Sequence, residues 1–292
     1  MKRFLIVFLL ASSAFAQSLP KPDHVVIVIE ENKGFADVIG SAKAPYINSL
    51  AAAGASLTAY SGLHHPSQPN YIELFSGAEH GVCNDSCVTS PITAVNLAAS
   101  LFAAGKTFIG YADGLPDPIT ACKSGFYARK HCPWINFTGV PMSATADFKT
   151  FPRTNAGFAS LPTVSFVIPT LDHDMHDPTK AIPTAVHLGD DWLKKHLEKY
   201  RQWAMTNNSL LIVTWDEDSS SYKYPTWCGP GINTTPPANR IPTIVVVEHV
   251  KPGSTSAKTY THYNLLRTIE DMYGLPAIGG SATAGAIDDI WQ

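Results

Sequence analysis

The stretch HVVIVI at residues 24–29, followed at once by Glu30, Glu31 and Asn32, decides the fold class of this chain. Its continuous β-branched residues predict a strand that is buried on both faces, as in a parallel sheet covered by helices. Ligands of such sheets bind beyond the carboxyl ends of the strands. The polar residues that follow each strand are therefore the first candidates for a functional site.

The same alternation of buried strands and amphipathic helices continues along the chain. Apolar runs predict strands at 163–168, 209–215 and 242–247. Helical periodicity predicts helices at 44–53, 190–205 and 262–273. Residues 77–162 and 219–240 lack such patterns, and we expect the first of these stretches to be a loop-rich excursion over the sheet edge. The pattern indicates one α/β domain, residues 17–292, around a mostly parallel sheet.

Composition excludes two classes of protein. The chain of 292 residues is 45% hydrophobic and only 15% charged, which excludes a disordered polyelectrolyte. Its formal net charge is −3 and it has no run of lysine or arginine. Proteins that bind the phosphate backbone usually carry a basic face, so a nucleic-acid partner is disfavoured.

The first residues have the features of a secretory signal peptide. Lys2 and Arg3 precede an apolar run at 4–11, and Ala14-Phe15-Ala16 forms a small-x-small cleavage site. The run is shorter than the ~20 apolar residues that a membrane-spanning helix needs. We expect cleavage after Ala16 and a secreted or periplasmic product without a transmembrane segment.

The cysteines are interpreted in the light of export. All five follow the predicted cleavage site: Cys83, Cys87, Cys122, Cys132 and Cys228. An oxidising compartment favours disulfides, and an odd number leaves one thiol over. We expect two disulfides and one free cysteine.

Acidic clusters follow three of the predicted strands. Glu30, Glu31 and Asn32 follow the first strand. The strand at 163–168 is followed by Asp172, His173, Asp174, His176 and Asp177, and the strand at 209–215 by Asp216, Glu217 and Asp218. Any one cluster is compatible with a solvated turn, but carboxylates gathered at one edge repel, and a divalent cation relieves that repulsion. Oxygen ligands suit Mg²⁺, Ca²⁺ or Mn²⁺, while imidazole adds affinity for Zn²⁺ or Fe. Asp172 and His176 could bind one ion if their turn is helical.

A serine between two prolines is the candidate nucleophile. In HHPSQPNY, residues 64–71, Pro66 and Pro69 restrict the backbone around Ser67. The alternative is a turn residue or a helix N-cap. Free serine is a poor nucleophile, and contact with a metal would lower its pKa. A separate basic cluster, Arg129 to His131, could hold a substrate phosphate, with a solvated loop patch as the alternative.

Several long motifs occur in a recognisable order. The motifs are EEN, HPSQPNYIELFSG, DHDMHD, VTWDEDS and THYNLLRTIEDMYGL, and shared stretches span residues 24–290. The chain resembles the phosphoesterase family of bacterial acid phosphatases and phospholipases C, within the alkaline phosphatase superfamily, and especially its secreted mycobacterial-type acid phosphatases. The resemblance implies an alkaline phosphatase-like α/β fold with helices on both faces of the sheet.

The resemblance also implies roles for individual residues. Ser67 matches the nucleophile, followed by Pro69 and Asn70, and we count Asn70 among the catalytic residues. The metal ligands implied are Glu31, Asn32, Asp216 and Glu217, with Asp172 in the region of a second metal or of phosphate contacts. His176 and His262 are expected to contact the transition state or protonate the leaving group. The expected substrate-binding residues are His65, Arg129, Lys130 and His131. Only Cys87 and Cys122 are shared, which implies a disulfide between them.

The function implied is that of a secreted, metal-dependent acid phosphatase that hydrolyses phosphate monoesters through a phosphoserine. A phosphoinositide headgroup is among the substrates that the resemblance suggests, although the loops that set substrate choice differ. Glu217 stands where many superfamily members carry a histidine, which favours Mg²⁺, Ca²⁺ or Mn²⁺ over Zn²⁺ and leaves Fe open. The alternatives are a phospholipase C-type phosphodiesterase and a secreted binding protein that has lost its chemistry.

Overall fold

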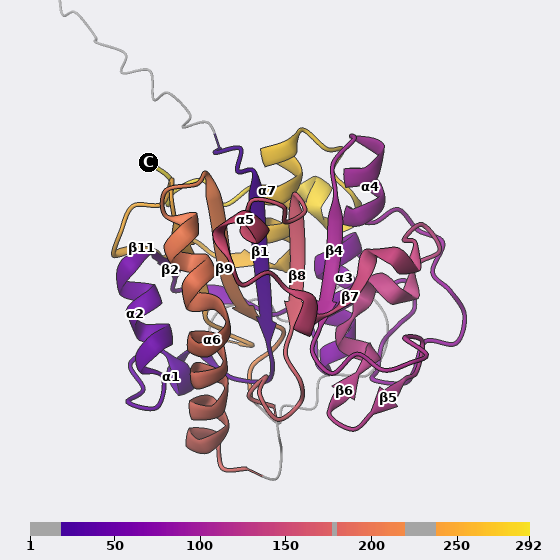
Figure 1. The fold of residues 1–292 in the computed structure, drawn as a ribbon, viewed down its shortest axis with the longest axis horizontal. Helices are drawn as coiled ribbons and strands as arrows, with labels where there is room; N and C mark the ends of the chain where they lie inside the picture. Colours follow the sequence, from indigo (N-terminus) through magenta and orange to yellow (C-terminus); the bar gives the residue numbers. More distant parts are fainter. Residues whose placement is uncertain (1–18, 177–179, 220–237) are drawn as a thin grey trace, which may run out of the picture.

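An eight-stranded sheet forms the centre of the molecule (Figure 1). The computed structural model describes residues 19–176, 180–219 and 238–292. Across the sheet the strands are β11 (Ser254–Ser256), β2 (Ala55–Leu57), β10 (Thr243–Val247), β9 (Ser209–Trp215), β1 (His24–Glu30), β8 (Val164–Ile168), β4 (Phe108–Ala112) and β7 (Thr145–Asp147). Two small ribbons pair β3 (Tyr60–Ser61) with β12 (Tyr260–Thr261) and β5 (Lys123–Ser124) with β6 (Tyr127–Ala128).

The sheet is mostly parallel, as the sequence predicts. β1 lies between β8 and β9 and runs parallel to both, and β4 is parallel to β8 and β7. Only β10 is antiparallel to its neighbours β9 and β2 within the described sheet. The central strands are buried on both faces, which explains their uninterrupted apolar sequences.

Helices cover both faces of the sheet. The helices are α1 (Phe35–Val38), α2 (Pro45–Ala53), α3 (Ser67–Ser76), α4 (Leu97–Ala103), α5 (Asn155–Phe158), α6 (Ile182–Ala204) and α7 (His262–Tyr273). In Figure 1, α2 and α6 lie in front of the sheet, and α3 and α7 lie behind it. α1, α2 and α5 contact α6, whereas α4 and α7 contact α3. The predicted fold class, an α/β sheet flanked on both faces, is confirmed.

Residues 77–162 are more regular than we expected. This stretch supplies α4 and two strands of the main sheet, β4 and β7, as well as the β5–β6 ribbon. β4 reads FIGYA, a short strand interrupted by glycine. A Cβ atom at Gly110 would lie 2.1 Å from the Trp134 ring, so the glycine makes room for that buried side chain. A packing requirement therefore weakened the strand pattern here.

Helix α3 is the most deeply enclosed helix on the rear face. Every one of its residues, from Ser67 to Ser76, is buried. It begins directly after a cis peptide between His65 and Pro66 and ends at Gly77, whose φ of 76° is the left-handed conformation of a helix C-cap. The fold therefore places Ser67 at the start of a helix fixed on all sides.

Cysteine chemistry partly agrees with the prediction. Cys87 and Cys122 form the expected disulfide, and Cys83 is also disulfide-bonded. Cys132 is a buried free thiol, while Cys228 and the predicted signal peptide lie outside the described residues. In the part of the chain that the structure describes, no helix has both the length and the apolar character needed to cross a bilayer.

Candidate active site

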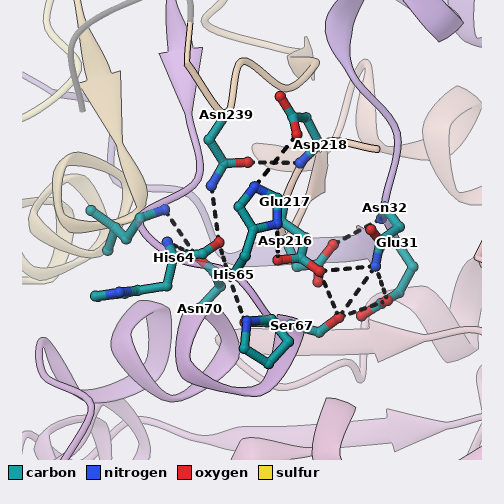
Figure 2. A network of polar contacts seen from close by, with 12 residues as sticks. Glu31, Asn32, His64, His65, Ser67, Asn70, Asp216, Glu217, Asp218 and Asn239 are labelled. Carbon is teal, nitrogen blue, oxygen red and sulfur yellow. Dashed lines mark hydrogen bonds and ion pairs between the residues drawn. The ribbon is translucent and has the colours of Figure 1, made fainter. Parts of the chain in front are cut away.

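The carboxyl ends of β1 and β9 meet the first turn of α3 (Figure 2). Glu30 pairs in register with Trp215, so the residues that follow, Glu31 and Asp216, emerge side by side. The backbone N–H of Asp216 donates to the carbonyl of Glu30 at 3.1 Å. Parallel pairing thus brings together two acidic segments that are almost 200 residues apart in the sequence.

Ser67 lies between two carboxylates. Its Oγ is 3.0 Å from Glu31 Oε2 and 3.1 Å from Glu217 Oε1, and the residue is only 1% exposed. A hydroxyl has a single hydrogen, so it can donate to only one of these oxygens at a time. Ser67 is also the first residue of α3, and the positive end of a helix favours negative charge at that position.

Asn32 connects the two acidic segments. Its φ of 52° is left-handed, a conformation that asparagine adopts more readily than most residues. Its backbone N–H donates to Asp216 Oδ1 at 3.0 Å, and its side-chain Nδ2 donates to Glu217 Oε1 at 3.0 Å and Glu31 Oε2 at 3.2 Å. The turn after β1 therefore orients its amide group among the carboxylates.

Burial perturbs the titration of this cluster. Burial, followed by the charge of Glu31, raises the pKa of Asp216 and of Asp174 well above the usual range. Burial also raises the pKa of Glu217, against the opposing effect of His65. Although burial acts to raise the pKa of Glu31, the charge and hydrogen bond of His131 hold it well below its usual value. Three of these four buried carboxylates are thus harder to ionise than usual, as expected where like charges are enclosed together.

The donor set matches a hard divalent cation. Asp216 Oδ2 is buried and has no hydrogen-bond partner among the described residues. The groups around Ser67 Oγ are carboxylates, whose oxygens are ligands of the kind that Mg²⁺, Ca²⁺ and Mn²⁺ prefer, and the Asn32 amide, which presents its Nδ2 to them. A cation would also offset the mutual repulsion that raises the pKa of Asp216.

Histidines line the acidic cluster on two sides. His65 Nδ1 is 2.7 Å from Glu217 Oε2, and although burial opposes it, the contacts with Asp218 and Glu217 raise the pKa of His65 to about 9. His131 Nε2 is 2.9 Å from Glu31 Oε1, and its ring stacks on Tyr71. Two predicted substrate-binding histidines therefore contact predicted metal ligands directly.

His176 and His262 occupy different environments. His176 Nδ1 lies 3.7 Å from Glu31 Oε2, and its side chain is 29% exposed. His262 is fully buried, with Nε2 2.8 Å from the Asp216 carbonyl oxygen and Nδ1 3.1 Å from the Tyr60 hydroxyl. Both ring nitrogens of His262 are thus engaged within the protein, whereas His176 reaches the open side of the cluster.

Other predicted residues lie outside the Ser67 cluster. Asp172 pairs with its neighbour His173 at 3.4 Å, and among the described contacts no hydrogen bond or ion pair joins it to Ser67 or to Glu31. The turn that contains Asp172 and His176 is not helical, so the two side chains do not converge. Asp174, which pairs with His131 at 3.6 Å, is the acid from this segment that approaches Glu31.

The basic triplet at 129–131 does not form one patch. Arg129 donates to the Thr120 carbonyl at 2.6 Å and to Cys87 Sγ at 2.8 Å, so its charge is used inside the loop. Lys130 pairs with Asp85 at 2.5 Å, and His131 turns inward to the acidic cluster. Arg129 to His131 form a short 3₁₀ turn, in which consecutive side chains point in different directions. The linear sequence does not reveal this.

Two positioning residues complete the site, one predicted and one missed. Asn70, predicted as catalytic, accepts from the backbone N–H groups of Leu63 and His64 at 2.8 and 2.9 Å and thereby holds the segment that precedes Ser67. Asn239 accepts from the Asp218 N–H at 2.7 Å and donates to the His64 carbonyl at 3.0 Å. Asn239 lies in a stretch without regular pattern, so the sequence carried no signal for it.

A second group of potential ligands lies nearby, and two of its three members already pair with each other. The ligand atoms of His64, Glu73 and Glu79 lie within 4.8 Å of one another. His64 Nε2 is 3.0 Å from Glu73 Oε2, and the Tyr263 hydroxyl donates to the same carboxylate. This group resembles a buried ion pair under the nucleophile segment more than a vacant set of metal ligands.

Comparisons with known proteins show the family of this chain. Residues 41–276 match the model of the Phosphoesterase family. The chain is 46% identical over 277 residues to the phosphatidylinositol-3-phosphatase of Mycobacterium tuberculosis, covering 94% of this chain and 85% of that protein. It is 29% identical over 252 residues to the phosphate-repressible acid phosphatase of Penicillium chrysogenum, covering 80% of this chain and 55% of the fungal one.

Solved structures show the same fold at low sequence identity. A protein in the alkaline phosphatase superfamily from Vibrio parahaemolyticus superposes with a TM-score of 0.63 at 12% identity, covering 95% of this chain and 73% of that one. Murine ectonucleotide pyrophosphatase/phosphodiesterase 5 superposes with a TM-score of 0.59 at 10% identity, covering 92% of this chain and 100% of that one. The chain belongs to the phosphoesterase family, and its fold is that of the alkaline phosphatase superfamily.

Proposed function

We propose that this protein is an exported, metal-dependent acid phosphatase that cleaves phosphate monoesters through a phosphoserine at Ser67. That it is a phosphoric monoester hydrolase follows from its family and its phosphatase relatives. The observation that supports a phosphoserine mechanism is the position of Ser67 Oγ, about equally far from Glu31 and Glu217 at the start of α3. A hydroxyl so placed can lose its proton to a carboxylate and act as a nucleophile.

A divalent cation would be held by Glu31, Asn32, Ser67, Asp216 and Glu217. When bound, it would neutralise charge on the phosphoryl group and lower the pKa of the serine hydroxyl. The support for this assignment is the density of buried carboxylates and the unpaired Asp216 Oδ2. His65 and Asn239 then act indirectly, since they hold Glu217 and the Asp218 backbone in place.

The proposed reaction has two displacements at phosphorus. In the first, the Ser67 proton passes to a neighbouring carboxylate, Oγ forms a bond to phosphorus, and the ester P–O bond breaks. His176, on the open side of the cluster, gives its proton to the departing alkoxide, which leaves as the alcohol. In the second, His176 takes a proton from the water that attacks phosphorus, the Oγ–P bond breaks, and the carboxylate returns its proton to Oγ, so that serine and protonated His176 are regenerated and inorganic phosphate is released.

The proposal extends to the substrate and to export. The relative from Mycobacterium tuberculosis is named for a phosphoinositide, which makes such a headgroup a candidate substrate. The Cys87–Cys122 disulfide and the predicted signal peptide support export, because disulfides persist in oxidising compartments. A phospholipase C-type diesterase would use the same nucleophile, and an inactive binding protein would be expected to lack one of the clustered groups.

Hydrolysis of p-nitrophenyl phosphate and of its bis-ester by metal-replete protein, with and without chelator, tests the proposal. We expect monoester cleavage that chelator abolishes, and a loss of at least about 10³-fold in kcat for Ser67→Ala, since the nucleophile is removed. The exposed Ser160→Ala variant is the matched control. Faster cleavage of the bis-ester would indicate a diesterase, and full activity of Ser67→Ala would refute the assignment of the nucleophile.

A further inference from the structure

A cavity of about 510 Å³ opens beside the proposed nucleophile. Gln68, the residue after Ser67, and His176, the proposed proton donor, both contribute to its lining. The cavity therefore adjoins the position at which the departing alcohol would lie in the proposed reaction. Arg129 and Lys130, which the resemblance counts among the substrate-binding residues, also line it.

Apolar surface from one hairpin forms much of the lining. The β5–β6 ribbon contributes Gly125 and Phe126 at its tip and Ala128 at its base, and Leu171 adds a further apolar side chain. Phe126 is 56% exposed, which is unusual for a phenylalanine. The Phe126 carbonyl accepts a hydrogen bond from the Leu171 N–H at 3.0 Å, so the tip is tied to the segment that leads to His176.

The wall of the cavity is preformed rather than loose. The Cys87–Cys122 disulfide is part of the lining. Arg129 also connects the two chain segments that the disulfide joins. Its guanidinium donates to the Thr120 carbonyl on one side and to Cys87 Sγ and the Val88 carbonyl on the other. The Arg129 side chain therefore holds these two segments together, and Lys130 is paired with Asp85.

We propose that this cavity binds the alcohol portion of the ester and selects alcohols that carry a ring, with the ring face packed on Phe126. This inference rests on the proposed phosphatase function and specifies its substrate class. A ring buried against Phe126 and Leu171 gains apolar contact and favourable aromatic geometry. A small open-chain polyol would lose water from its hydroxyls without comparable contact.

The test compares benzyl phosphate with glycerol 2-phosphate, because both release an alkoxide and only one carries a ring. In Phe126→Ala we expect kcat/KM for benzyl phosphate to fall about tenfold, mostly through KM, as for an interaction made equally in ground and transition states. For glycerol 2-phosphate the change should stay within twofold. Phe126→Trp should restore benzyl phosphate hydrolysis, and Met142→Ala, an exposed apolar residue outside the lining, is the control.

Equal effects on the two substrates, or no effect of Phe126→Ala on either, would overturn the inference while leaving the phosphatase function intact. If the wild-type protein cleaves neither ester, the proposed function fails, and binding then decides the inference. In that case calorimetry would compare benzylphosphonate with methylphosphonate. Tighter binding of the benzyl compound, lost in Phe126→Ala, supports a ring-binding cavity, and equal dissociation constants refute it.

Discussion

At the residue scale, the two predicted catalytic histidines have unequal access to a substrate. His262 is buried between the Tyr60 hydroxyl and the Asp216 carbonyl, and burial lowers its pKa to about 4. His176 is partly exposed beside Glu31. We therefore expect only His176 to deliver a proton to the leaving group, while His262 holds the Asp216 segment in position.

Leaving groups of different basicity separate these roles. A protonating residue matters for an alkoxide but hardly for p-nitrophenolate, so His176→Asn should lower kcat for benzyl phosphate by 10²-fold or more and for p-nitrophenyl phosphate by less than about tenfold. His262→Asn should reduce both rates by a similar factor, because it disturbs the position of Asp216. The kinetics of the two variants on the two esters are the measurement. The opposite pattern would return the acid role to His262.

The predicted site residues that the structure brings together and those that it keeps apart differ in how they are held. Glu31, Asn32, Asp216 and Glu217 follow strands that pair in register, so strand prediction alone brings them together around Ser67. Asp172 and Arg129 sit in irregular turns, where the direction of each side chain depends on local backbone angles. One such angle is the left-handed φ of 74° at Met175, a conformation that the pattern of apolar residues does not predict.

At the scale of elements, helix α2 begins without a side-chain cap of its own. Its N-cap residue is Ala44, and Asp190 of α6 supplies the missing acceptors: Oδ2 for the Tyr46 N–H at 3.1 Å and Oδ1 for the Ile47 N–H at 2.7 Å. Asp190 is 1% exposed. The two helices on the front face are thus joined by a buried cap in trans.

Removing this cap should weaken the whole front layer. In Asp190→Ala, two buried N–H groups would lose their acceptors, and we expect the free energy of unfolding to fall by about 2–3 kcal/mol. Urea denaturation followed by circular dichroism measures the change. Asp191→Ala, next to it but with a side chain 61% exposed, should change stability by less than about 0.5 kcal/mol. Equal effects of the two substitutions would contradict the role of the cap.

Element prediction succeeded where packing and sequence pattern coincide. The helix at 262–273 was predicted with the bounds it has, because an amphipathic run there ends at Gly274 in the left-handed conformation. The long helix α6 begins at Ile182 rather than at residue 190, because Pro183 lies in its first turn, where proline is compatible with a helix and does not end it. β4 was missed because Gly110 interrupts its apolar run, and β7 because it has only three residues and is stabilised by its pairing with β4.

At the scale of the molecule, Glu270 links stability to pH. This buried side chain of α7 accepts from the Ser281 hydroxyl at 2.6 Å and the Ile278 N–H at 3.1 Å, and burial raises its pKa to about 7. The folded state therefore retains a proton that the unfolded chain releases near pH 4.5. This contribution to stability is complete below that pH and is lost as the pH rises through about 7.

Glu270→Gln should remove that dependence. The glutamine oxygen can accept from the Ile278 N–H, and its Nε2 can donate to the Ser281 Oγ, so we expect the variant to be more stable than wild type at pH 8 by about 1–2 kcal/mol and nearly equal at pH 4. Thermal or urea unfolding at the two values measures the difference. Asp191→Asn, an exposed acid on α6, serves as the control and should show no gain in stability over wild type at pH 8 relative to pH 4. A constant offset between Glu270→Gln and wild type at both pH values would refute the linkage.

The burial of α3 has a consequence for the thermal inactivation of the protein. Because all ten residues of this helix are buried, its amide hydrogens should exchange with solvent only when the molecule opens globally. The serine at its first position would then keep its geometry until cooperative unfolding begins. Activity retained after brief heating should accordingly follow the loss of overall structure, without an earlier phase of inactivation caused by local fraying.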